Sequence, residues 1–125
     1  MNLINSKIII TFLFFIFIII SGISLSRTGK PYSTLIITIH KLIGLGVGIY
    51  LTQFIYQLLK VNQLSSTEIF AVVLTILIFL GLVSTGGLIS AEKNIPNPFS
   101  YVHKIFPYLA VASTSVTVYL LTFVR

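Results

Sequence analysis

The sequence predicts an all-α integral membrane protein, a bundle of four transmembrane helices built from two parallel helical-hairpin repeats. Of its 125 residues, 56% are hydrophobic and only 8% are charged, whereas soluble domains carry about 25% charged residues. The charged residues leave four long charge-free runs, which cover residues 8–26, 42–59, 69–91 and 105–124. About 20 apolar residues span the hydrocarbon core as a helix, and the alternating pattern of a membrane barrel is absent.

The predicted helices belong to a single transmembrane domain, residues 1–125, and cover about residues 8–26, 32–60, 68–91 and 99–124. The first follows Lys7 and could be read as a signal peptide. The length of its apolar run and its counterpart in the second half of the chain favour a retained helix. Pro31 and Pro98 each suit the first turn of a helix, where the missing N–H of proline costs nothing. These prolines predict the starts of the second and fourth helices.

The third observation is an internal repeat at an offset of 63 residues, which needs no gap. It relates residues 8–61 to residues 69–125 and places His40-Lys41 on His103-Lys104. The chain has only two histidines, so their coincidence is informative. An offset of two helices gives parallel repeats, related by a pseudo-twofold axis along the membrane normal. We therefore expect the second and fourth helices to be parallel, with both histidines at the same membrane depth.

The two histidines are candidate ligands of one haem iron. Ionisable residues inside membrane helices are usually functional, and neutral imidazole is a good axial ligand. Helix bundles commonly hold cofactors by side chains from facing helices. Gly44 and Gly48, one and two turns beyond His40, would leave room for the ring. Pro107, four residues after His103, should kink its helix.

Further candidates surround this predicted site. Lys41 and Lys104 could neutralise the haem propionates, or could simply lie at the headgroups as lysines do at helix ends. Gly86 or Gly87 could pack around the haem edge, although close helix packing is the default role of small residues in membranes. Ser21 and Ser84, which the repeat aligns, belong to the same group of small residues.

Other chemistry has little support. Thr52, Gln53 and Gln57 form a polar stripe that could bind a quinone headgroup or pair helices, and we favour helix pairing. The net charge of +6 does not indicate nucleic acid, because the basic residues lie singly at the ends of the apolar runs. There is no cysteine and no aspartate, which excludes a thiolate metal site and leaves little for a paired-carboxylate site.

The two His-Lys pairs, the glycines of the second and third helices and the hairpin duplication resemble the small four-helix membrane b-type cytochromes, such as the transmembrane modules of the cytochrome b and ferric-reductase kind. The resemblance covers nearly the whole chain. Members often have four histidines and two stacked haems that carry electrons across the membrane. With two histidines and Met1 as its only methionine, this chain can ligate at most one six-coordinate haem b.

We therefore expect a membrane electron carrier with one haem b between His40 and His103, near one membrane face, and without catalytic residues. The resemblance implies a subunit or partner of a larger redox complex. The alternatives are a pigment-binding or cofactor-free structural subunit and, last, a small transporter. Arg27, Lys30 and Lys93, with the lysines that follow the histidines, place the histidine side in the cytoplasm by the positive-inside rule.

Overall fold

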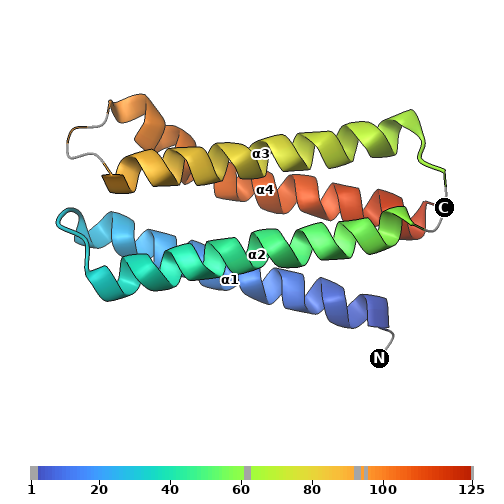
Figure 1. The fold of residues 1–125 in the computed structure, drawn as a ribbon, viewed down its shortest axis with the longest axis horizontal. Coiled ribbons are helices and arrows are strands. Elements are labelled where there is room, and N and C mark those ends of the chain that lie inside the picture. Colours follow the sequence, from blue (N-terminus) through green and yellow to red (C-terminus); the bar gives the residue numbers. More distant parts are fainter. Residues whose placement is uncertain (1–2, 61–62, 92–93, 95, 125) are drawn as a thin grey trace. The chain divides into compact units, whose positions relative to one another are not determined.

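A computed structural model of the chain describes residues 3–60, 63–91, 94 and 96–124. Its four helices are α1 (Leu3–Thr28), α2 (Thr34–Leu59), α3 (Ser66–Ala91) and α4 (Asn97–Phe123) (Figure 1). Each of them is long and apolar enough to cross a membrane. The predicted all-α class, with four helices of membrane-spanning length, is therefore confirmed.

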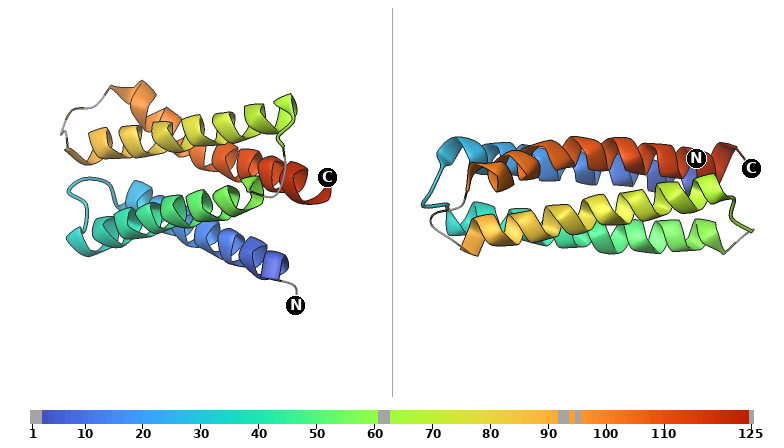
Figure 2. Two further views of the ribbon diagram at one scale, coloured as in Figure 1. Left: turned by 45° about the vertical axis from the view of Figure 1, so that its right-hand side comes forward. Right: turned by 90° about the horizontal axis from the view of Figure 1, so that it is seen from above.

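The chain divides into two compact units, Met1–Gln57 and Leu58–Arg125. We call the pair α1 and α2 hairpin 1, and the pair α3 and α4 hairpin 2. In each hairpin the two helices run side by side in opposite directions (Figures 1 and 2). Each hairpin is described by itself, so the parallel, twofold-related arrangement of the repeats stays a prediction.

The first helix begins earlier than predicted. It starts at Leu3 rather than at residue 8, so that Lys7 lies within α1 and not ahead of it. The Lys7 amine donates a hydrogen bond to Oε1 of Gln57 on α2. It also lies 5.8 Å from the centroid of the Phe54 ring, within the range of a cation–π interaction. Because α2 supplies these two partners for the Lys7 amine, the charge of Lys7 does not end α1.

The turn between α1 and α2 also differs from the prediction. Gly29 has φ 67, a backbone conformation that favours glycine, and its N–H donates to the carbonyl of Leu25 at 3.1 Å. Pro31 follows a cis peptide bond and lies before α2, not in its first turn. The helix starts at Thr34, because the carbonyl of Ser33 accepts its first hydrogen bond, at 3.0 Å. Serine is a favoured residue at this N-cap position.

Both helices of hairpin 2 begin at residues that favour the start of a helix. In a capping box, the backbone N–H and hydroxyl of Ser65 donate to Oε2 of Glu68, at 2.7 and 2.9 Å. The N–H of Glu68 donates back to the Ser65 hydroxyl at 3.3 Å. Glu68 is buried, and the box supplies hydrogen-bond donors to its carboxylate. α4 starts at Asn97 with Pro96 as its N-cap and Pro98 in the first turn, as predicted.

The buried stripe of the second helix in each hairpin recurs at the predicted offset. In α2 the buried residues are Val47, Leu51, Phe54 and Ile55. In α4 the residues 63 positions later are all buried, namely Ala110, Thr114, Thr117 and Val118. Large apolar side chains are exposed along all four helices, as expected of helices that face lipid.

A buried hydroxyl cluster joins the two helices of hairpin 2. The hydroxyls of Thr75 on α3 and Thr117 on α4 lie 3.0 Å apart. Both donate to the carbonyl oxygen of Ala71, at 2.9 and 3.1 Å. In membranes such bonds between helices replace the hydrophobic driving force that holds soluble bundles together.

Candidate functional site: two histidine seats

His40 is held between α2 and α1. It is the seventh residue of α2, and so lies about 9 Å inside the helix at 1.5 Å per residue. Its Nδ1 lies 2.8 Å from the hydroxyl oxygen of Ser21 on α1. Its Cε1 lies over Gly22, where a methyl group would be 3.2 Å away. We call this arrangement of histidine, hydroxyl and glycine the His40 seat.

His103 is held in the same way in hairpin 2. It is the seventh residue of α4, and its Nδ1 lies 3.0 Å from the hydroxyl oxygen of Thr85 on α3. A methyl group at Gly86 would lie 2.8 Å from Cε1. We call this arrangement the His103 seat.

The contacts of the two histidines align the first helices of the two hairpins at a different offset from the ungapped repeat. The histidines are 63 residues apart, but their partners Ser21-Gly22 and Thr85-Gly86 are 64 residues apart. Ser84, which the ungapped comparison aligns with Ser21, is exposed. The predicted match of Ser21 with Ser84 is therefore wrong. The structurally equivalent residue is Thr85, because its hydroxyl contacts the histidine.

A second pair of threonines supports this register. Thr11 and Thr75 are also 64 residues apart, and both are buried, at 5% and 2% exposure. Each donates its hydroxyl hydrogen to the carbonyl four residues earlier on its own helix, at 2.8 and 2.9 Å. The first helices of the hairpins thus correspond at an offset one residue larger than the second helices.

The chemistry of the seats fits an axial haem ligand. Histidines that bind metals usually hydrogen-bond through the other ring nitrogen, which fixes the ring's orientation. Here Nδ1 has a hydroxyl partner in both seats, which makes Nε2 the nitrogen to consider for iron. Among the described residues, no three side chains of histidine, aspartate or glutamate gather as a metal cluster, and a haem with two axial ligands needs no such cluster.

Comparison of the chain with protein-family models, curated proteins and solved structures finds no match. Function is therefore to be inferred from the two seats and their surroundings.

The glycines predicted to border a haem ring occupy different environments. A methyl group at Gly44 would lie 3.3 Å from Cδ1 of Ile18 on α1, so Gly44 faces the partner helix of its own hairpin. Gly86 lies against the His103 ring. At Gly48 and Gly87 a methyl group would meet no atom of the described residues within 4 Å. Helix packing thus accounts for Gly44, and the histidine seat accounts for Gly86.

Pro107 lies inside α4, which continues to Phe123, and the first part of that helix, in orange in Figure 1, runs at an angle to the rest. One residue earlier, the ring of Phe106 contacts α3 at Gly81, where a methyl group would lie 2.5 Å from Cε2. The glycine therefore lets the aromatic ring approach the backbone of α3.

Lys41 and Lys104, which follow the histidines, are both exposed.

One residue of the polar stripe of α2 contacts the other helix of its hairpin. The Gln57 amide oxygen accepts from Lys7 on α1, whereas the Thr52 hydroxyl donates to the carbonyl of Gly48 on its own helix at 2.8 Å. The Gln57 contact is of the kind that helix pairing predicts. Lys93, which the orientation prediction used, lies outside the described residues.

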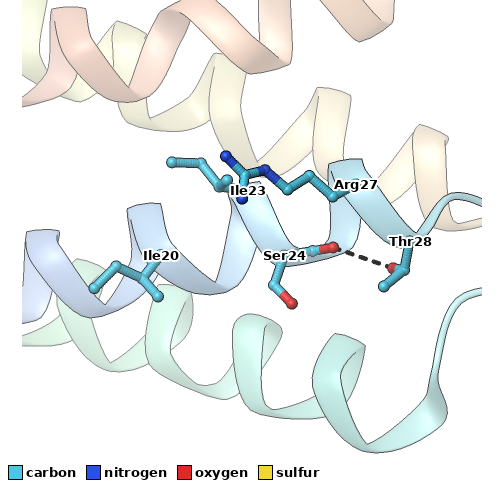
Figure 3. A pocket seen from close by; sticks show the side chains of 5 residues that line it. All are labelled: Ile20, Ile23, Ser24, Arg27 and Thr28. Carbon is cyan, nitrogen blue, oxygen red and sulfur yellow. Dashed lines mark hydrogen bonds between the residues drawn. The ribbon is translucent and has the colours of Figure 1, made fainter.

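An open hollow of about 310 Å³ lies on α1 near its end. Its lining residues are Ile20, Ile23, Ser24, Arg27 and Thr28 (Figure 3). The Thr28 hydroxyl donates to the carbonyl of Ser24 at 3.1 Å, and the Arg27 side chain reaches back toward Ile23. Because one helix supplies all five residues, this is a surface hollow and not an enclosed ligand site.

The sequence carries a signal for the two seats. A hydroxyl residue followed by glycine occurs as Ser21-Gly22 and as Thr85-Gly86, near the end of the first helix of each hairpin. Gly22 was not among the predicted site residues, and neither was Thr85. Allowing a one-residue gap in the repeat would have aligned these two pairs.

Proposed function

We propose that this chain is a membrane electron-transfer protein that binds one b-type haem through His40 and His103. It would act as a subunit or partner of a larger redox complex. The observation that carries the proposal is the equivalence of the two seats. The only two histidines of the chain lie at the same position in their helices, each with a hydroxyl at Nδ1 and a glycine under the ring.

The ligand count supports one haem and not two. The sequence offers two imidazoles, no thiolate and a single thioether, Met1. A bis-histidine haem uses both imidazoles and exchanges one electron at its iron. The protein would contribute the ligands, their orientation and a low-dielectric surrounding, which together set the reduction potential.

The cations next to the ligands suit an anionic cofactor edge. Lys41 and Lys104 directly follow the two histidines and are exposed. A lysine stem can extend along the helix while its amine stays in the polar region of the bilayer. We therefore propose that the amines of Lys41 and Lys104 neutralise the two haem propionates.

The deciding experiment is the visible spectrum of the purified full chain, with variants of each histidine. We expect low-spin haem absorption, with one haem per chain. His40→Ala and His103→Ala should each abolish that spectrum. Gly46→Ala is the matched control, because Gly46 is not a predicted site residue and a methyl group there meets no described atom within 4 Å. An unchanged reduced-minus-oxidised spectrum in either histidine variant would refute a shared site.

A structural subunit without cofactor is the second candidate, and one observation favours it. Both histidines hydrogen-bond to the other helix of their own hairpin, and polar bonds of this kind also stabilise cofactor-free membrane bundles. In that case the purified chain would be colourless, and each histidine variant would lower stability without any spectral change. A pigment-binding subunit would show chlorin absorption instead.

The proposed orientation places the histidine end of the helices in the cytoplasm. It follows from the basic residues at that end, among them Arg27 and Lys30, by the positive-inside rule. A reporter fused after Arg125 should then be active only outside the cytoplasm. Activity in the cytoplasm would reverse the orientation without affecting the haem site.

A further inference from the structure

The hydroxyls that contact the histidines also bond to their own helix. The Ser21 hydroxyl donates to the carbonyl of Ile18 at 3.0 Å. The Thr85 hydroxyl donates to the carbonyl of Gly81 at 2.7 Å. A hydroxyl has one hydrogen and two lone pairs. When that hydrogen is directed to the backbone, the oxygen can only accept from the imidazole.

We propose that Ser21 and Thr85 are positioning residues that hold each histidine with its hydrogen on Nδ1 and its lone pair on Nε2. The backbone carbonyl of one helix thereby determines, through a single hydroxyl, which nitrogen on the other helix can bind a metal. The same arrangement occurs in both hairpins, in a chain that has no other histidine.

The Thr85 hydroxyl has a second backbone acceptor within reach, because the carbonyl of Leu82 lies 3.3 Å away. Its hydrogen is therefore directed to α3 whichever of the two carbonyls accepts it, and its oxygen again faces the imidazole as an acceptor.

For a bound haem, which rests on the proposed function, this bond affects the reduction potential. A ring N–H that donates to an oxygen makes the ligand nitrogen more basic, and a more basic ligand stabilises the oxidised iron. Loss of the hydroxyl should therefore raise the midpoint potential. We expect a change of up to tenfold in the ratio of oxidised to reduced protein at a fixed potential, which is about 59 mV for one electron.

The first test does not depend on haem. The cofactor-free full chain, labelled with ¹⁵N only at histidine and held in micelles, is studied by NMR at a pH where both rings are neutral. We expect both histidines to show a protonated Nδ1 and an unprotonated Nε2. Ser21→Ala should disturb this pattern at His40 alone. A protonated Nε2 in the parent chain would overturn the proposal, whether or not the chain binds haem.

The second test is a redox titration of the haem-loaded chain. Ser21→Ala and Thr85→Val should each raise the midpoint potential, and Ser21→Thr and Thr85→Ser should restore it. Ser84→Ala is the matched control, because Ser84 neighbours Thr85 and is exposed. An unchanged or lowered potential in both hydroxyl variants overturns the tuning role. Failure to bind haem contradicts the proposed function and leaves the NMR result to decide the tautomer.

Discussion

Gly86 lies under the ring of His103, so closely that a methyl group on its α-carbon would be 2.8 Å from Cε1. No side chain larger than hydrogen fits there without moving the ring. At Gly87, one residue further, a methyl group would meet no described atom within 4 Å. The close contact with the His103 ring is therefore specific to Gly86.

Gly86→Ala should displace His103 and lower the amount of haem bound per chain. Overpacking a filled site typically costs about 1–3 kcal/mol. Gly46→Ala, at a helix position where a methyl group meets no described atom within 4 Å and which is not a predicted site residue, should keep the parent's haem content and gain about 0.5–1 kcal/mol of stability, because alanine favours the helix over glycine. The measurement is haem absorbance per purified chain. Equal haem content in the two variants would show that the ring does not rest on Gly86.

Gly44→Leu should destabilise hairpin 1, because Gly44 faces Ile18 on α1. We expect a loss of about 1–3 kcal/mol, and haem content that falls in proportion to folded protein. Ile18→Ala should relieve the clash, so that the double variant shows a coupling of about 0.5–3 kcal/mol. Unfolding by added SDS, followed by circular dichroism, measures both. If haem per folded chain falls while stability is unchanged, Gly44 borders the haem instead, as the sequence suggested.

Thr117→Val should destabilise hairpin 2 by removing the hydroxyl that bonds to Ala71 and Thr75. Bonds between membrane helices are worth about 0.6 kcal/mol on average and up to about 1.7 kcal/mol. The same SDS titration provides the measurement. Thr117→Ser keeps the hydroxyl and should retain most of the stability. Ser115→Ala, whose hydroxyl bonds within α4, is the control, and an equal loss there would remove the argument for the cluster.

Ser65→Ala and Glu68→Ala should each weaken the start of α3, because each removes one half of the capping box. Loss of an N-cap costs about 0.5–2 kcal/mol. Glu68→Gln should be nearly neutral, since glutamine also completes a capping box. Ser66→Ala, at an exposed neighbouring position, controls for surface changes. Amide hydrogen exchange in the first turn of α3 measures the effect, and uniform protection across the variants would contradict it.

The fold class could be predicted from the sequence because its signal is large and simple. Four long runs without charge correspond to the four helices, and the prolines predicted the start of α4 correctly. The predictions failed where a local contact decided the outcome. The charge pattern predicts Lys7 as the boundary of a helix, but Gln57 and Phe54 contact its amine within hairpin 1. Proline preference predicts Pro31 in the first turn of α2, but Ser33 is the N-cap instead.

The candidate site could be predicted in part. The two histidines were found because they are rare and recur in register. Their partners Ser21 and Thr85 were not, because a one-residue shift in a helix moves a side chain about 100° around the axis. An ungapped comparison therefore aligned Ser21 with the exposed Ser84. Contacts across a hairpin depend on the register of both helices, and that register is not evident from apolar composition alone.

The hydroxyl and the glycine that contact each histidine come from its own hairpin. Ser21 and Gly22 precede His40 within hairpin 1, and Thr85 and Gly86 precede His103 within hairpin 2. Two separate two-helix polypeptides would thus carry the same histidine, hydroxyl and glycine contacts as the single chain.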